Sequence, residues 1–172
     1  IMEKNERIGL VLEGGGMRGI YTAGVLDVMM DNNIEFPGVI GVSAGAVHGG
    51  TFLAGQRGRN IRYYKKYAGD KRFMSLRNFI FTGEFVGRKF CYDELPNKLD
   101  PLDYDTFKKK SNDVEFYVVV SDVETGKSRY IRIFDFKEQM DALRASASLP
   151  YISKIVEYDG MKFLDGGVCD SI

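Results

Sequence analysis

The chain has 172 residues, of which 44% are hydrophobic and 28% charged, and its 24 basic residues balance 24 acidic ones to a formal net charge of zero. This composition is ordinary for a globular protein and excludes disordered, collagen-like and coiled-coil chains, while the balanced charge gives no indication of nucleic-acid binding. No apolar run approaches the about 20 residues that span a bilayer, and the charged residues 1–7 do not fit a signal peptide. The two cysteines, Cys91 and Cys169, lie far apart in the sequence, which favours a reducing compartment. We therefore expect a single cytoplasmic domain over residues 1–172.

The first part of the chain alternates between strand and helix patterns. Residues 8–12 form an apolar run typical of a buried parallel strand, and the glycine cluster after them opens a helix-like segment that ends near Asn32. Residues 39–42 form a second buried run, and a helix pattern begins at about Ala44. Strand, helix, strand and helix in this order predict an α/β domain with a parallel sheet.

Two segments in the middle of the chain leave alternatives open. Residues 57–72 carry seven basic residues and one acidic residue, Asp70, a local charge of +6, together with Tyr63, Tyr64 and Tyr67. This segment fits either contact with an anionic membrane surface or a solvated helix whose tyrosines enter the core. Residues 73–92 are rich in Phe and Gly without a clean period, which fits either a lid or acyl-binding wall, or irregular core.

The last third of the chain predicts two hairpins separated by a helix. Residues 114–120 form a strong β pattern, and a turn at residues 124–127 leads into the alternating residues 129–134. Residues 137–147 predict a helix that Pro150 stops. Asp159-Gly160 between two apolar runs is the strongest short hairpin signal of the chain. The expected fold is therefore α/β, with a mainly parallel sheet flanked by helices and a β-hairpin region near the C-terminus.

The first glycine cluster satisfies G-x-G-x-x-G between a strand and a helix, through Gly14, Gly15, Gly16, Met17, Arg18 and Gly19. A dinucleotide site would also need an acidic residue at the end of the second strand, about 20 positions on. Glu35 has this spacing but precedes the second strand. Free backbone N–H groups at a helix N-terminus can equally bind an oxyanion. A Walker A loop is excluded, because no Gly-Lys-Ser/Thr follows.

The second glycine motif, Gly41-Val42-Ser43-Ala44-Gly45, matches G-x-S-x-G between a strand and a helix, the context of a nucleophile elbow. The chain must reverse sharply at Ser43, and Gly41 and Gly45 remove the Cβ atoms that would collide there. The helix that follows directs its positive end at the hydroxyl. The alternative is a turn serine between two packing glycines.

A nucleophilic Ser43 needs a base, and the chain has one histidine, His48. Five residues along a helix place His48 about 140° around the axis and about 7.5 Å along it, facing away from the hydroxyl. The partner is then a carboxylate, or a group beyond residue 172. Asp165 is the best candidate, since it ends a predicted strand and is followed by Gly166 and Gly167.

These three motifs, with the small-residue block at residues 145–150, resemble the patatin-like phospholipase family over residues 8–170. The resemblance implies a three-layer sandwich and a lipid acyl hydrolase of phospholipase A or esterase type. It implies a dyad of the nucleophile Ser43 and the base Asp165, with Arg18 at the family's arginine position in an oxyanion hole of residues 14–19. Family members usually continue further, so the chain looks truncated at its C-terminus.

The expected partners are a lipid or another ester substrate and, peripherally, a membrane surface. We expect no cofactor, because no cluster of His, Cys or acidic residues has metal-ligand spacing. The sequence indicates no oligomeric state. Two other functions stay open: a nucleotide-binding α/β protein that uses the loop at residues 14–19, and a triad α/β-hydrolase whose histidine lies beyond residue 172.

Overall fold

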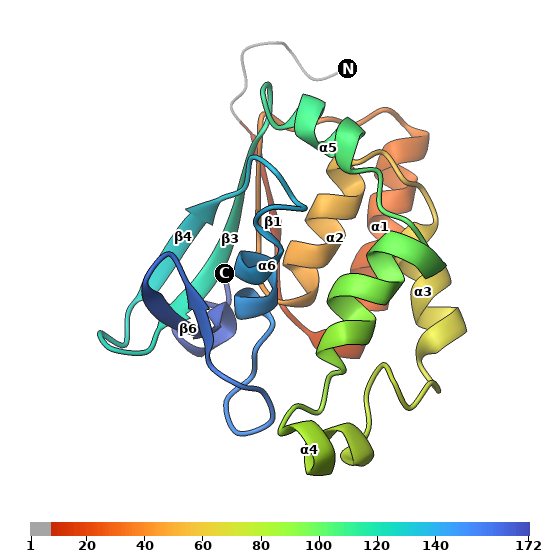
Figure 1. Ribbon diagram of the computed structural model, residues 1–172. Helices are drawn as coiled ribbons and strands as arrows, with labels where there is room; N and C mark the ends of the chain where they lie inside the picture. The colour runs from red at the N-terminus through yellow and green to blue at the C-terminus, as the bar shows by residue number, and fades with distance from the viewer. Residues whose placement is uncertain (1–7) are drawn as a thin grey trace.

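A computed structural model of the chain describes residues 8–172, and residues 1–7, expected not to be a signal peptide, lie outside the described part (Figure 1). In chain order the elements are β1 (Gly9–Leu12), the 3-10 helix η1 (Gly16–Gly19), α1 (Ile20–Asp31), β2 (Gly38–Gly41), α2 (Ala44–Leu53), α3 (Arg59–Tyr67), α4 (Leu76–Thr82), the π-helix η2 (Phe90–Leu99), α5 (Tyr104–Lys110), β3 (Glu115–Asp122), β4 (Ser128–Arg132), α6 (Met140–Ser146), β5 (Val156–Tyr158), β6 (Met161–Asp165) and the 3-10 helix η3 (Gly166–Val168). The predicted order of strand, helix, strand and helix is confirmed.

Six strands form one mixed sheet. β1 pairs with β2 and β2 with β3 in parallel, whereas β4 and β6 pair antiparallel with β3, and β5 antiparallel with β6. β1, β2, β3 and β5 therefore point the same way. The expected α/β fold with a mainly parallel sheet is confirmed, and so are both predicted hairpins.

β2 and β6 lie end to end along the same edge of β3. Gly41, the last residue of β2, pairs with Val118, and Asp165, the last residue of β6, pairs with Val120. β4 pairs with both of these valines and so occupies the other edge of β3. Because β2 runs parallel and β6 antiparallel to β3, the two strands run toward each other. Their C-terminal ends lie opposite Val118 and Val120, two positions apart on β3.

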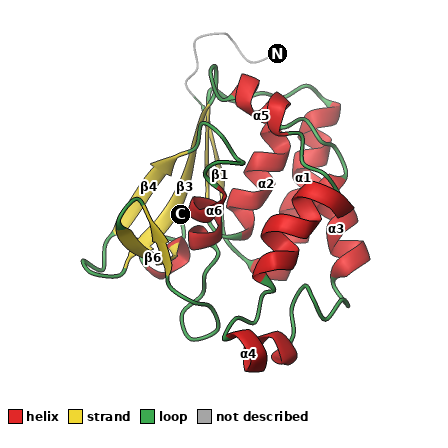
Figure 2. Ribbon diagram, in the orientation of Figure 1, coloured by secondary structure: helices red, strands yellow, loops and turns green. Residues whose placement is uncertain are grey.

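The helices cover one face of the sheet (Figures 1 and 2). α2 contacts β1, β2 and β3, α6 contacts β3, β5 and β6, and α1 and α3 contact α2. Within residues 8–172 the other face carries only the short η3, and Val11 and Tyr130 on it are 57% and 50% exposed. Two layers of the three-layer sandwich that the resemblance implies therefore lie within the described residues.

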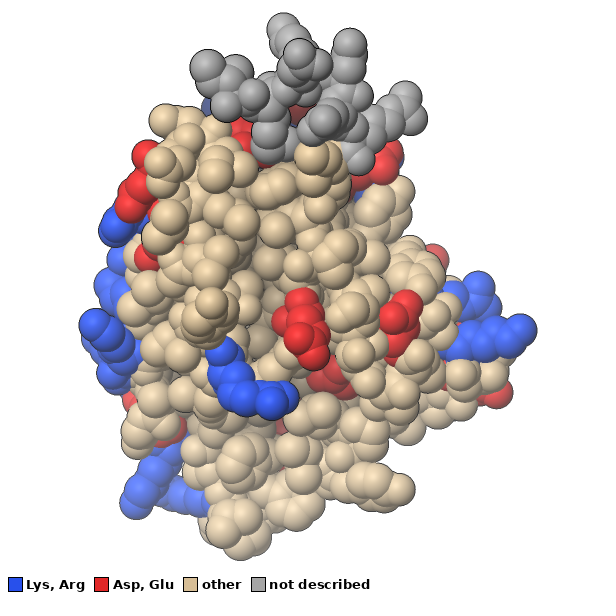
Figure 3. Space-filling model, turned by 180° about the vertical axis from the view of Figure 1, so that it is seen from behind, with Lys and Arg blue, Asp and Glu red and all other residues tan. Residues whose placement is uncertain are grey.

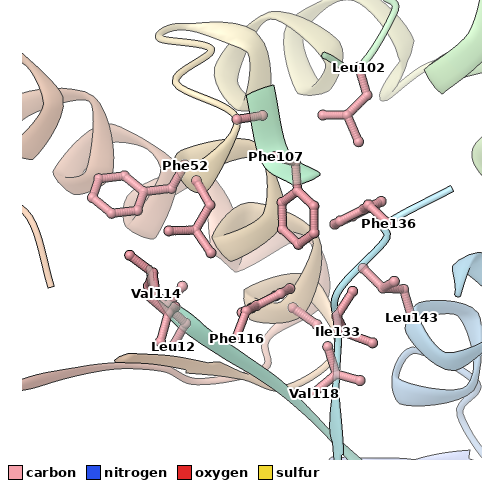
Figure 4. Close-up of a cluster of buried hydrophobic side chains, with 14 of the residues drawn as sticks. Leu12, Phe52, Leu102, Phe107, Val114, Phe116, Val118, Ile133, Phe136 and Leu143 are labelled. Carbon is pink, nitrogen blue, oxygen red and sulfur yellow. The ribbon is translucent and has the colours of Figure 1, made fainter. Parts of the chain in front are cut away.

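The main core fills the space between the sheet and helices α2, α5 and α6 (Figure 4). The ring of Phe107 packs edge-on against Phe116 and Phe136, with centroid separations of 5.8 and 5.1 Å. Glycines let α2 lie close to this core, because a Cβ atom on Gly50 would collide with the ring of Phe136. This close packing holds the later part of α2 against the core.

The middle of the chain is more regular than the sequence pattern indicates. Residues 73–110 contain α4, the ten-residue η2 and α5. η2 follows the i→i+5 pattern of a π-helix, which a search for a 3.6-residue period does not detect. Tyr63, Tyr64 and Tyr67 are all buried, so of the two interpretations of residues 57–72 the structure supports the helix whose tyrosines enter the core. Among residues 8–172, no helix combines the length and apolar character that crossing a bilayer requires.

Candidate active site

Ser43 occupies the turn between β2 and α2 in a strained backbone conformation. Its φ of 54° and ψ of −120° lie in a region that side chains other than Gly rarely adopt. The Ser43 N–H donates a hydrogen bond to Ser146 Oγ at 3.0 Å, and the Val42 N–H donates to the Leu12 carbonyl at 3.0 Å. Bonds on both sides of the turn thus hold the hydroxyl at the N-terminus of α2.

The glycines that flank Ser43 are required by packing. A Cβ atom on Gly41 would lie 2.7 Å from the backbone of Ala46, and one on Gly45 would collide with the Leu12 carbonyl. Both approaches bring α2 directly against β1 and β2. The two interpretations of this motif are therefore compatible, because packing glycines surround a strained serine.

Asp165 ends β6 and is 2% exposed. Its Oδ1 accepts a hydrogen bond from the Gly167 N–H at 2.8 Å, while its Oδ2 is buried without a hydrogen-bond partner among residues 8–172. Burial raises the pKa of Asp165 above its ordinary value, against smaller lowering effects of the Gly167 N–H and the Ser43 hydroxyl. The Ser43 hydroxyl is thus close enough to act on this pKa, although the two side chains do not have the geometry of a hydrogen bond.

Contacts of η3 independently place Asp165 next to the serine turn. A Cβ atom on Gly167 would lie 3.1 Å from Asp165 Oδ1 and 3.7 Å from Cγ1 of Val42, the residue before Ser43. Gly166 packs just as closely, since a Cβ atom there would collide with the Val119 carbonyl. The two predicted loop glycines therefore let the carboxylate approach both β3 and the turn.

The first glycine loop lies against the same turn. A Cβ atom on Gly14 would be 3.2 Å from Cβ of Ser43. Five backbone N–H groups near Ser43 have no hydrogen-bond acceptor among residues 8–172, namely those of Gly14, Gly15, Gly16, Met17 and Ala44. Such groups can donate hydrogen bonds to an oxygen atom on which negative charge develops, and so stabilise that charge.

Arg18 and Gly19 differ from the other loop residues. The Arg18 N–H donates to the Gly15 carbonyl at 3.0 Å, so it is already used, and the Arg18 side chain is exposed. Gly19 is buried, and a Cβ atom on it would lie 2.6 Å from Cε1 of His48. The predicted loop therefore divides into a donor part at its start and a packing part at its end.

His48 is a buried helix residue and no partner of Ser43. Its Nε2 lies 3.3 Å from the Tyr63 hydroxyl, and burial lowers the pKa of His48 to about 4. The neighbouring Tyr64 donates from its hydroxyl to the Gly16 carbonyl at 3.0 Å and so braces the loop. The sequence gives no sign of these roles of Tyr64 and Ser146, because side chain to backbone bonds across 48 and 103 positions leave no local pattern.

A cavity of about 250 Å³ opens at Ser43. Gly16, Met17 and Ala44 line it beside Ser43, so three of the five residues with a free N–H border the same space. Its walls are mostly apolar, and residues 73–92 contribute Phe73, Met74, Phe85, Val86, Cys91 and Tyr92. This supports the interpretation of residues 73–92 as a wall around a site. Asp165 does not line the cavity.

The structure gives no support to a nucleotide or metal site. Glu35 precedes the start of β2, is 72% exposed and pairs with Lys110 at 2.6 Å, whereas a ribose contact needs an acidic residue at the end of the strand, where Gly41 lies. In the described part of the chain, no three His, Cys, Asp or Glu side chains gather in a way that could hold a metal ion.

A family model described as Patatin-like phospholipase matches residues 10–172. The chain belongs to the patatin-like phospholipase family. Similar proteins include an "Uncharacterized protein YjjU" of Escherichia coli (strain K12), 30% identical over 96% of this chain and 47% of that protein. A "Lysophospholipase NTE1" of Meyerozyma guilliermondii is 27% identical over 98% of this chain and 11% of its own length.

VipD from Legionella pneumophila has a similar fold, with a TM-score of 0.52 at 14% identity over 98% of this chain and 47% of that one. An "Uncharacterized NTE family protein" of Mycobacterium tuberculosis (strain ATCC 25618 / H37Rv) is 25% identical over 96% of this chain and 44% of that protein. The chain spans about half the length of the bacterial relatives it matches.

Proposed function

We propose that this patatin-like chain is a serine-dependent lipid acyl hydrolase of phospholipase A or esterase type, with Ser43 as nucleophile and Asp165 as base. One observation supports the proposal: β2 and β6 run toward each other along β3, the strained Ser43 follows β2, and the buried Asp165, whose Oδ2 has no donor among residues 8–172, ends β6. Membership of the family supports lipid acyl hydrolysis in general.

The reaction proceeds in two halves. Ser43 Oγ attacks the ester carbonyl while Asp165 takes its proton, and the same proton then passes to the departing alcohol, which leaves an acyl-enzyme. Water attacks the acyl group, gives its proton to Asp165, and the acid product leaves as Ser43 Oγ recovers that proton. In each half the N–H groups of Gly16, Met17 and Ala44 stabilise the oxyanion.

An ordinary aspartate is a weak base for an alcohol. The burial that raises the pKa of Asp165 makes it a stronger base than an exposed aspartate. The N-terminus of α2, which begins directly after Ser43, adds the favourable electrostatic effect of a helix dipole on the developing negative charge. Neither half of the proposed reaction uses a metal ion.

The substrate class in this proposal is a lipid ester. The apolar walls of the cavity at Ser43 suit an acyl chain, and one similar protein is named as a lysophospholipase. A cytoplasmic location with peripheral contact to a membrane belongs to the same proposal.

Labelling by a fluorophosphonate tests the proposal directly. We expect the reagent to modify Ser43, identified by peptide mass spectrometry, and Ser43→Ala to abolish both labelling and p-nitrophenyl ester hydrolysis. Asp165→Asn should slow both reactions at least about 100-fold, in the range of losses seen for catalytic groups. Ser146→Ala, which removes a turn contact but neither reacting group, serves as the comparison. Label on another residue, or an Asp165→Asn variant of nearly full activity, would contradict the dyad.

A further inference from the structure

α4 exposes large apolar side chains and buries none of its residues. Leu76, Ile80 and Phe81 are 71%, 76% and 77% exposed. Tyr151, in the loop at residues 149–154, is 95% exposed. Apolar side chains exposed together to this degree mark an interaction surface rather than an ordinary water-facing one.

Backbone hydrogen bonds, and not burial, hold α4 in place. The Ser75 N–H at its start donates to the Phe85 carbonyl at 3.1 Å. Residues 73–75 and 85–87 thereby pair as a short stem under the helix. The Phe85 N–H in turn donates to the Ile152 carbonyl at 2.8 Å, so the loop that carries Tyr151 lies beside the stem (Figure 1). The exposed side chains of α4 and of this loop therefore form one surface, which we call the α4 surface.

The α4 surface continues into the cavity at Ser43. Four residues of the stem and two of the loop line that cavity: Phe73, Met74, Phe85, Val86, Leu149 and Ile152. The segments that carry the α4 surface therefore also contribute apolar walls to the cavity that holds the candidate nucleophile.

The charges around α4 are mainly positive. Residues 71–89 hold five basic residues and one acidic residue, Glu84, a local charge of +4. No ion-pair partner within residues 8–172 is present for Lys71, Arg77, Arg88 or Lys154. Seen from behind, the lower end of the molecule, where α4 lies in Figure 1, is largely uncharged at its tip, with Lys and Arg beside it (Figure 3). An apolar tip flanked by basic residues is complementary to an anionic lipid surface.

We propose that the α4 surface docks the protein on an anionic lipid membrane and delivers lipid to the cavity. Ile80, Phe81 and Tyr151 enter the boundary between head groups and acyl chains, and Arg77 and Lys154 contact lipid phosphates. Arg77 already lies 5.9 Å from the centre of the Phe81 ring, a position from which its charge remains in the head-group layer. Only the purpose of docking, delivery to Ser43, rests on the proposed function.

Vesicle flotation tests docking apart from hydrolysis, since binding is measured in the Ser43→Ala background. The vesicles contain phosphatidylcholine alone or an equimolar mixture with phosphatidylglycerol. We expect binding to the mixed vesicles, a loss of about tenfold or more in Ile80→Ser/Phe81→Ser, and a loss of about fivefold in Arg77→Gln or Lys154→Gln. In protein with Ser43 intact, the first variant should also lower the ratio of vesicle hydrolysis to p-nitrophenyl butyrate hydrolysis.

Val28→Ser/Phe134→Ser is the matched control, because it removes one exposed aliphatic and one exposed aromatic side chain, 59% and 52% exposed, from other surfaces. It should bind vesicles like the parent. Equal binding by Ile80→Ser/Phe81→Ser and the parent would overturn the proposal. The proposal would also be overturned if the parent did not bind vesicles but formed a dimer, and if Ile80→Ser/Phe81→Ser were monomeric. The α4 surface would then be a contact between two copies of the chain. Failure of fluorophosphonate labelling with intact vesicle binding would instead remove only the proposed function.

Discussion

At the scale of single residues, the site combines two features that oppose stability. Ser43 holds a strained φ of 54°, and Asp165 is buried with one oxygen that has no hydrogen-bond partner in the described part of the chain. Both persist because neighbouring groups are fixed, Ser146 on one side and Gly167 on the other. Strain and an unpaired polar atom at the same point are typical of a site that is kept for chemistry rather than for folding.

The raised pKa of Asp165 leads to a prediction about how stability depends on pH. Because its folded-state pKa is raised above 3.8, its contribution to stability is greatest below that pH and is lost as the pH rises through the raised pKa. We therefore expect Asp165→Asn to unfold at the same or a higher temperature than the parent at pH 7, with the difference shrinking below pH 4. Calorimetry across this range checks the sign. The parent's ester hydrolysis should lose activity on acidification with a midpoint above 3.8, and a markedly destabilised variant at pH 7 would contradict the argument.

At the scale of elements, α2 fixes the dimensions of the cavity. Ser43, Val47 and Thr51 line it at intervals of four residues, so they share one helix face that extends about 12 Å. At the far end Arg59 Nη1 donates to Thr51 Oγ1 at 3.2 Å, and this buried polar pair does not favour an apolar chain. An extended chain of about ten carbons fits the distance, because carbon–carbon bonds of about 1.5 Å at tetrahedral angles advance the chain by about 1.25 Å per carbon.

A bulky side chain half-way along this face should shorten the accepted acyl chain. We expect Val47→Phe to lower kcat/KM for p-nitrophenyl decanoate about tenfold more than for the butyrate, since overfilling a packed wall costs about 1–3 kcal/mol. Val28→Phe on the exposed surface of α1 is the control. Kinetics on esters from butyrate to palmitate give the chain-length profile, and an equal loss on all esters would show that the cavity does not hold the acyl chain.

An element of this fold could be predicted from the sequence where a short stretch of residues encodes it. β1, β2 and the serine turn are encoded by apolar runs next to glycines, and β6 by Asp159-Gly160, so their order and the position of Asp165 could be inferred. The structure also contains α4, η2 and α5, which no regular spacing of hydrophobic residues in the sequence predicts. The contacts of Ser146 and Tyr64 depend on the folded arrangement of distant segments, so the sequence alone could not show them.

At the scale of the whole molecule, Asp100 joins α3 to the segment between η2 and α5. Arg62 contacts its carboxylate at 2.7 Å, and the buried Arg59 donates to its carbonyl at 2.8 Å and lies 3.8 Å from the carboxylate. Burial lowers the pKa of Arg59, against the opposing effect of Asp100. Removing the carboxylate would leave a buried guanidinium without its counter-charge.

We expect Asp100→Ala to lower the free energy of unfolding by about 3 kcal/mol, the loss typical of a broken buried pair. Asp31→Ala is the comparison, because its ion pair with Arg57 is exposed to solvent and should contribute much less to the free energy of unfolding. Urea denaturation gives both values. Similar small losses in the two variants would mean that Asp100 is not needed to hold α3 in place.

The head-on arrangement of β2 and β6 also has a consequence for biosynthesis. During translation Ser43 is synthesised early, whereas Asp165 follows only after more than a hundred further residues. If the proposed pair carries the reaction, a nascent chain has its nucleophile without its base until β6 inserts beside β3. On the proposed mechanism, lipid cleavage therefore cannot begin before β6 has been translated and has paired with β3.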